Sequence, residues 1–279
     1  MAIDKAIDSA QLDADLTSVA NAIRTKGGTS AALAFPAGFV SAVEAIETGG
    51  GGYTADEIAS GVEPSGAITV TATKLKNYAF YDCAEITSLV ITNDIPWKNW
   101  GSYAFANCTS LTTVDAPNLT QLREKIFKGC AKLKDCNFPK VTKIDGDQVI
   151  EGTAVETLVF PAFTGGVYSN ALRNNKSLAT VDLNACTSLG GNCFSGCTVL
   201  SNLVIRGDAV TQMGNISTFT NTPFASGGSG GTLYVPSARI EDFKSATNWS
   251  TILGYGNNKI LPIEGSIYET QYADGTPIT

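Results

Sequence analysis

Residues 103–114 read YAFANCTSLTTV, and the residue types of this phrase return at regular distances along the chain. When the chain is aligned on the phenylalanine of the phrase, successive copies are 25, 22, 23, 22, 22 and 25 residues apart. A period of this length is typical of a solenoid, in which each copy adds one turn to a coil. The aligned positions are Phe80, Phe105, Phe127, Ile150, Leu172, Phe194 and Phe219.

Each copy keeps the same internal order. A cysteine or a small polar residue follows the aligned position by three residues, as Cys108 does, and in most copies a leucine or isoleucine follows by six, as Leu111 does. A short alternating stretch comes next, with Val114 and Ala116 as its apolar members in this copy. Alternation of period two turns one face of a strand inward and the other outward. We therefore expect one strand per turn in a parallel ladder, with neighbouring strands about 4.8 Å apart.

The repeat resembles the BspA-type leucine-rich repeat family, whose units of about 22 to 23 residues read AF-x-x-C-x-x-L-x-x-[LIV]-x-[LIV]-P. The copies that match this motif best are YAFYDCAEITSLVI, YAFANCTSLTTVDAP and NCFSGCTVLSNLVI, whereas the copies at Ile150 and Leu172 depart from it. The resemblance covers roughly residues 68–262. It implies a β-rich solenoid of about seven turns that works as a binding surface.

The repeat divides the chain into successive segments. Residues 1–48 contain two amphipathic stretches, LTSVANAIRTKGG and FPAGFVSAVEAI, which predict a small helical hairpin that docks the chain to an assembly or to a second copy. Residues 49–67 are a glycine-rich hinge and lead-in, and residues 68–231 are the solenoid. Residues 232–265 break the period and predict a strand, a helix and a strand that cap the open end. Residues 266–279 lack an apolar period, so we expect a loosely ordered tail.

The N-terminal phrase LTSVANAIRTKGGTSAALAFPAGFVSAVEAI resembles segments near the ends of tail-associated structural proteins of phages and prophages of gut Gram-positive bacteria. The first residues, MAIDKAIDSAQLDADL, are acidic and lack the apolar region of a secretory signal peptide. The resemblance implies a virion-associated protein, or one that becomes extracellular by lysis. The other expectation is a cell-surface protein exported by a route other than Sec.

Composition argues against several classes of function. The net charge is −7, and the 19 lysines and arginines form no basic run, so we expect no binding to nucleic acid. No stretch of 18 apolar residues occurs, so we expect no membrane insertion. The chain has no histidine, which excludes Ser-His-Asp and Cys-His catalysis and histidine-ligated zinc. We therefore expect neither an enzyme nor a cofactor.

The seven cysteines invite three other interpretations. A disulfide framework favours an even count and an oxidising route, and zinc requires converging pairs of ligands that the spacing does not supply. A catalytic thiol has no histidine partner. Because every cysteine falls on an inward repeat position, we expect structural thiols in the core. Four of them form one ladder: Cys83, Cys108, Cys130 and Cys197.

The outward strand positions are the candidate binding surface. Solenoids commonly bind partners on their sheet surface, although short polar side chains also simply solvate a sheet. Asp115 and Asp182 lie three turns apart, roughly 14 Å at the strand spacing, which is too far for a glycosidase carboxylate pair. The candidates form two rows: Ser88, Thr113, Asp135, Thr157, Thr180 and Asn202 in one, and Val90, Asp115, Asn137, Val159, Asp182 and Val204 in the other.

Two further patterns have a structural interpretation. Trp97 and Trp100 suggest a sugar platform, but the repeat places both on core positions. The sequence Asp145-Gly-Asp147 suggests calcium, but it lacks the rest of an EF-hand loop and falls where a turn is expected.

Three functions remain open. The first is a non-catalytic recognition protein on a phage or prophage tail that binds a protein or glycan of a bacterial cell surface. The second is a BspA-like bacterial cell-surface adhesin. The third is a purely structural spacer.

Overall fold

The structure is a computed structural model that describes residues 52–53 and 65–278 of the 279-residue chain. The predicted helical hairpin of residues 1–48 and most of the predicted hinge lie outside the described residues.

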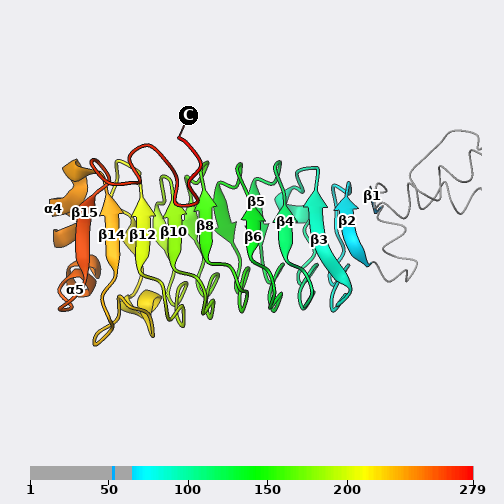
Figure 1. The fold of residues 1–279 in the computed structure, drawn as a ribbon, viewed down its shortest axis with the longest axis horizontal. Coiled ribbons are helices and arrows are strands. Elements are labelled where there is room, and N and C mark those ends of the chain that lie inside the picture. Colours follow the sequence, from blue (N-terminus) through cyan, green and yellow to red (C-terminus); the bar gives the residue numbers. More distant parts are fainter. Residues whose placement is uncertain (1–51, 54–64, 279) are drawn as a thin grey trace, which may run out of the picture.

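The described residues wind into the predicted β-solenoid, in which parallel strands from successive turns stack along the long axis of the molecule (Figure 1). Two five-stranded sheets follow one another on one side of the coil, and a third, built from the second strand of successive turns, lies on the other side. The first sheet contains β1 (Gly52–Tyr53), β2 (Gly66–Val70), β3 (Ile86–Ile91), β4 (Thr113–Asp115) and β6 (Asp135–Asn137). The second contains β8 (Thr157–Phe160), β10 (Thr180–Leu183), β12 (Asn202–Ile205), β14 (Thr232–Val235) and β15 (Lys259–Pro262). The third contains β5 (Gln121–Arg123), β7 (Lys143–Asp145), β9 (Gly166–Val167), β11 (Ser188–Leu189) and β13 (Gln212–Met213).

The strand ladder is interrupted once between the first two sheets, where β6 and β8 are not paired. The copy that contains β8 is also the one in which the spacing from Ile150 to the strand is one residue shorter than in its neighbours. The core continues across this interruption, because the rings of Phe138 and Phe160 stack with their centroids 6.1 Å apart and their planes 3° apart. One hydrophobic core therefore runs through the array.

The turns around each aligned position have left-handed backbone conformations. Residues two before and two after the aligned position recur with φ between 51° and 78°. In the copy at Phe105 these residues are Tyr103 and Asn107, and in the copy at Phe127 they are Lys125 and Gly129. Glycine and asparagine tolerate this region best, which explains why the residue two positions after the aligned one is so often glycine or asparagine.

Three thiols of the predicted ladder are fully buried, and each joins its turn to the turn before it. The Sγ atom donates to the main-chain carbonyl oxygen of the aligned residue one turn earlier. These bonds join Cys108 to Phe80 (3.2 Å), Cys130 to Phe105 (3.1 Å) and Cys197 to Leu172 (3.2 Å).

Cys83 differs from this prediction, because its side chain is only partly buried. It belongs to the first copy, and within the described residues a stacked copy lies on one side of it only. Cys136 is also partly buried, whereas Cys186 and Cys193 are buried. Among the described residues, six cysteines form no disulfide: Cys108, Cys130, Cys136, Cys186, Cys193 and Cys197.

The C-terminal end of the core is covered by short helices between the last two strands of the second sheet (Figure 1). One helix was expected near Ser237–Thr247; the structure has a 3-10 turn, η3 (Ser237–Arg239), followed by α4 (Ile240–Ser245) and α5 (Trp249–Leu253). The chain breaks between the helices because Ala246 is extended, with ψ 148°, and Asn248 is left-handed, with φ 66°. No helix of the described residues is long and apolar enough to cross a membrane.

Candidate functional site

The outward strand positions form two rows on the side of the first two sheets, each interrupted once between β6 and β8. In the first sheet Ser88 pairs with Thr113 and Thr113 with Asp135. In the second sheet Thr157 pairs with Thr180 and Thr180 with Asn202. The second row follows the same register two residues further along each strand, through Val90, Asp115 and Asn137, and then through Val159, Asp182 and Val204.

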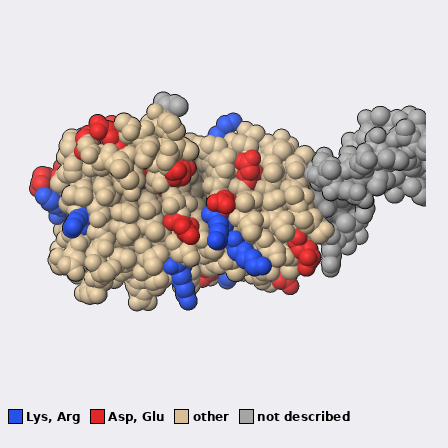
Figure 2. Space-filling model, viewed as in Figure 1, with Lys and Arg blue, Asp and Glu red and all other residues tan. Residues whose placement is uncertain are grey.

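The half of this face over β4, β6 and β8 is open. Asp115, Asp135 and Asn137 are exposed, and the Asn137 amide donates to Asp115 Oδ1 at 2.7 Å. A shallow groove of about 670 Å³ runs over these strands, with Asp115, Asp135, Glu156 and Asp274 as its acidic residues and Lys134 as its basic residue. Acidic and basic side chains lie side by side in the middle of this face (Figure 2). The groove therefore offers carboxylates and amides to a ligand that spans several strands.

The half over β10 and β12 is covered, which corrects the sequence prediction for Thr180, Asp182 and Val204. Asp182 is only 1% exposed, Thr180 and Val204 are also buried, and so is the candidate Val159 on the neighbouring β8. The cover is the C-terminal tail, residues 264–278, which crosses β14, β12 and β10 in front of the sheet (Figure 1). The expectation of a loosely ordered tail is therefore wrong. Asn202 and Thr157 remain partly exposed.

The tail is bound by an ion pair that belongs to the solenoid. Arg206 Nε lies 3.0 Å from Asp182 Oδ1, and Arg206 Nη2 lies 2.6 Å from Asp182 Oδ2. Burial raises the pKa of the Asp182 carboxyl, and the Arg206 guanidinium and the Ala273 N–H, which oppose this shift, do not cancel it. Sequence reasoning missed Arg206. The sequence feature that could have indicated it is a charged residue at a repeat position that is proline in other copies. Arg206 directly follows its strand, and the equivalent residues are Pro117, Pro139 and Pro161.

Trp97 is also placed differently from the prediction. Its side chain is 52% exposed, whereas Trp100 is buried as expected. The core position expected for Trp97 is filled by Ile95, which comes from the three extra residues of this copy and is 1% exposed. Trp97 instead donates its indole N–H to Asp145 at 3.1 Å, and the Arg123 guanidinium lies over its ring, 4.5 Å from the centroid.

The side of the third sheet carries a second shallow groove, of about 440 Å³. Its floor includes Gly166 and Gly190, and Tyr168, which is 54% exposed, lies at its edge. A Cβ at Gly190 would lie 2.5 Å from the main-chain nitrogen of Ser169, so the backbone of one turn approaches the next too closely for a side chain. Sequence reasoning missed this groove because it depends on glycines rather than on a motif.

An exposed tyrosine cluster was missed as well. Tyr78 stacks on Tyr103 with ring centroids 5.0 Å apart, and Tyr81 meets both rings at steep angles. Lys125 lies over the Tyr103 ring, 5.0 Å from its centroid. Tyr78 is 55% exposed and Tyr81 is 42% exposed, so the cluster is a surface feature.

The described residues contain no group of three or more cysteine, aspartate or glutamate side chains placed to hold a metal ion. Asp145, which the calcium pattern singled out, instead accepts from Lys143 at 3.0 Å and from Trp97.

The stacked parallel turns, the thiol ladder and the single continuous core define a leucine-rich repeat solenoid. The family model described as "BspA type Leucine rich repeat region" matches six copies, over residues 65–179 and 146–226. The matched residues make up more than half of the chain, and the chain belongs to this family. No curated protein matches it.

Solved structures with a similar chain path include three leucine-rich repeat proteins. A leucine-rich repeat protein from Bacteroides ovatus is 22% identical, with a TM-score of 0.46 over 53% of this chain and 41% of that chain. The T. pallidum leucine-rich repeat protein is 24% identical, with a TM-score of 0.43 over 53% of this chain and 72% of that chain. A leucine-rich cell surface protein from Faecalibacterium prausnitzii is 15% identical, with a TM-score of 0.25 over 72% of this chain and 79% of that chain. The match therefore spans less than half of the first of these proteins.

Proposed function

We propose that this chain is a non-catalytic recognition protein that binds a protein or glycan of a bacterial cell surface through the open half of its sheet face. The observation that carries the proposal is the groove of about 670 Å³ over β4, β6 and β8, with its exposed carboxylates Asp115 and Asp135. A shallow surface of this kind suits a broad protein or glycan contact better than a small molecule, which is usually bound in a deep apolar pocket.

We also propose that residues 1–48 dock the solenoid to a larger assembly, a phage or prophage tail. Support comes from the amphipathic pattern of this segment and from its resemblance to tail-associated proteins. A solenoid that binds a cell surface through its sheet face and is attached to a particle through residues 1–48 would act as a receptor-recognition element.

Binding of the labelled chain to whole cells tests the recognition proposal. We expect the chain to bind some strains in a panel of gut Gram-positive bacteria and Asp135→Lys to weaken that binding about tenfold, because it reverses a charge in the groove. Asp208→Lys is the matched control, since Asp208 is exposed in a turn outside the groove and the charge change is the same. Equal loss in both variants would argue against the groove. A chain that binds no cell and no glycan of an array would be a spacer.

Gene neighbourhood and particle assembly test the docking proposal. Flanking genes for tail or lysis proteins support the virion interpretation, whereas an adjacent sortase or secretion system favours the cell-surface adhesin. If a chain without residues 1–48 is still incorporated into particles, the docking role of this segment is wrong.

A further inference from the structure

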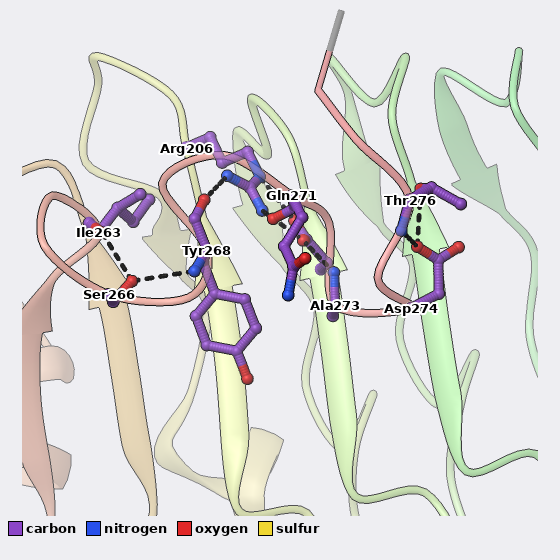
Figure 3. Close-up of polar contacts among 9 residues, drawn as sticks. Arg206, Ile263, Ser266, Tyr268, Gln271, Ala273, Asp274 and Thr276 are labelled. Carbon is purple, nitrogen blue, oxygen red and sulfur yellow. Dashed lines mark hydrogen bonds and ion pairs between the residues drawn. The ribbon is translucent and has the colours of Figure 1, made fainter.

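The covered half of the sheet face already holds a polypeptide segment, because the tail of residues 264–278 lies across it as a run of turns (Figure 3). The tail follows the last strand, β15, and runs back over β14, β12 and β10 towards β8. Its contacts show what kind of segment this part of the face accepts.

The solenoid binds the tail through main-chain atoms. Arg206 Nη1 donates to the carbonyl oxygen of Tyr268 at 2.6 Å, and Arg206 Nη2 donates to that of Gln271 at 3.1 Å. The N–H of Ala273 donates to Asp182 Oδ2 at 3.0 Å. Main-chain groups are common to all peptides, so this part of the contact depends on the turned path of the tail backbone, which the Gln271–Pro277 bridge closes, rather than on a particular side chain.

Two aromatic side chains of the tail add selectivity. The Tyr268 ring is only 6% exposed and meets the Tyr234 ring edge-on, with centroids 4.7 Å apart, beside the buried Val204. The Arg206 guanidinium carbon lies over the Tyr272 ring, 5.1 Å from the ring centroid. The two tyrosines are four residues apart, which sets the spacing that a bound segment must match.

We propose that Asp182, Arg206 and Tyr234 form a peptide-binding site for segments that turn as the tail does and carry two aromatic residues four positions apart. The tail occupies this site in the closed state, and a partner polypeptide with the same pattern displaces it. This proposal rests on the proposed function, because both place the partner on the same face of the solenoid.

The tail can leave without disrupting the solenoid. The Arg206–Asp182 ion pair lies within the array, and neither of its two bonds involves a residue of the tail. Several polar contacts of the tail are local, such as those from Ser266 to Ile263, which directly precedes the tail, and from Thr276 to Asp274 (Figure 3). Ile267, near the start of the tail, is 66% exposed.

A partner has to compete with a tethered segment, whose effective concentration is on the order of millimolar. The open groove supplies the additional contacts, because Asp274 of the tail lines it together with Asp135 and Glu156. The covered and open halves therefore form one continuous path. A partner segment longer than the tail would contact both halves, and its residues over the open half would face carboxylates.

The test is binding of a fluorescein-labelled synthetic peptide with the sequence of residues 264–278, EGSIYETQYADGTPI. The full chain with Tyr268→Ala and Tyr272→Ala has a weakened tail and should bind the peptide at least tenfold more tightly than the wild-type chain does. A peptide with both tyrosines replaced by alanine should bind neither the double variant nor the wild-type chain. Ile267→Ala is the matched control, because this tail side chain is exposed, and it should behave as the wild type.

Amide exchange at Ala273 reports whether the tail has left the sheet, because this N–H is bonded to Asp182 in the closed state. The proposal is overturned if Ala273 exchanges fast in the double variant and the peptide still binds no better than to the wild type. If Ala273 stays protected in the double variant, the tail has not left the sheet, and the peptide is tested instead on a chain that ends at Ile263. The proposal is then overturned if this shortened chain binds the peptide no better than the wild type does. In the opened chain, Arg206→Lys should weaken peptide binding about tenfold, because lysine cannot donate to Asp182 and two carbonyls in one plane. Undiminished peptide binding by this variant would also overturn the proposal.

Failure of the peptide to bind would not affect the proposed function. Cell binding through Asp115 and Asp135 is measured with the closed wild-type chain, and it depends on the open half alone.

Discussion

The Cys197 thiol donates to the main-chain carbonyl oxygen of Leu172, 3.2 Å away, and so connects one turn of the solenoid to the turn before it. One turn earlier, Asn175 occupies the position of the thiol and makes the corresponding bond to the Ile150 carbonyl. The copy at Leu172, which departs from the repeat motif, therefore keeps its inter-turn bond with a different side chain, whereas Thr153 in the copy at Ile150 donates its hydroxyl to Asn175.

Asn175 should contribute more to stability than a cysteine at the same position. Its Oδ1 accepts from the N–H of Thr153 at 2.8 Å and from the Thr153 hydroxyl at 2.9 Å, and its Nδ2 also donates to Leu172 O at 2.8 Å. Asn175 is fully buried, so Asn175→Ala leaves several buried groups unpaired and should cost about 3 kcal/mol. Urea unfolding measures this cost, and Asn257→Ala, at an exposed site, is the control. A cost equal to that of the control would contradict the proposed role of these bonds.

The thiols should react with iodoacetamide in an order set by burial. Burial raises the pKa of Cys197 to about 12, and it also raises the pKa of Cys193. Both thiols therefore stay protonated and shielded at neutral pH, and we expect them to be labelled only after denaturant is added. Cys83 is partly exposed and should be labelled first. Peptide mapping by mass spectrometry gives the order, and fast native labelling of Cys197 would contradict a buried ladder.

The period of the sequence predicted the strand register because each copy keeps a fixed distance from the aligned residue to its strand. Ser88, Thr113 and Asp135 were placed in one row by counting, and the structure pairs them in that order. The same counting failed at Trp97. The three extra residues of its copy contain another apolar side chain, Ile95, and packing rather than spacing decided which residue entered the core.

Burial of part of the candidate surface could not be predicted from the repeat. The N–H that covers Asp182 belongs to Ala273, which lies 91 residues further along the chain in a segment without any period. Periodicity predicts contacts between neighbouring turns, but it does not predict contacts made by a segment that folds back over several turns. The charged residue at position 206, where other copies carry proline, is the sequence feature that marks this contact.

Acid should weaken the contacts around Asp145. Partial burial raises the pKa of this carboxyl, but bonds from Lys143 and Trp97 and the charge of Arg123 outweigh it and lower the pKa below its ordinary value of 3.8. A carboxyl with a lowered folded-state pKa stabilises the protein above its unfolded pKa, and this contribution is lost as the pH falls through the folded-state value. The free energy of unfolding should therefore fall less steeply with acid in Asp145→Asn than in the wild type. Identical slopes in urea titrations at several acidic pH values would contradict this.

Removing Arg206 should be costly because it leaves a carboxylate in a buried site. The Asp182 side chain is 1% exposed and the Arg206 side chain is 11% exposed. Loss of one partner of a buried ion pair strands the other charge, so Arg206→Ala should destabilise the chain by about 3 kcal/mol. The same change should release the tail, because the carbonyls of Tyr268 and Gln271 lose their donor.

Two further variants separate the charge effect from lost packing. Arg239→Ala breaks an ion pair with Asp242 whose side chains are 38% and 50% exposed, and it should change stability by less than about 1 kcal/mol. The double variant Asp182→Asn with Arg206→Gln removes both charges and should recover a large part of the loss, since an amide can occupy the site without a stranded charge. Urea unfolding gives the stabilities, and amide exchange at Ala273 shows whether the tail stays bound. A double variant as unstable as Arg206→Ala would mean that packing by the arginine, and not its charge, holds this part of the solenoid together.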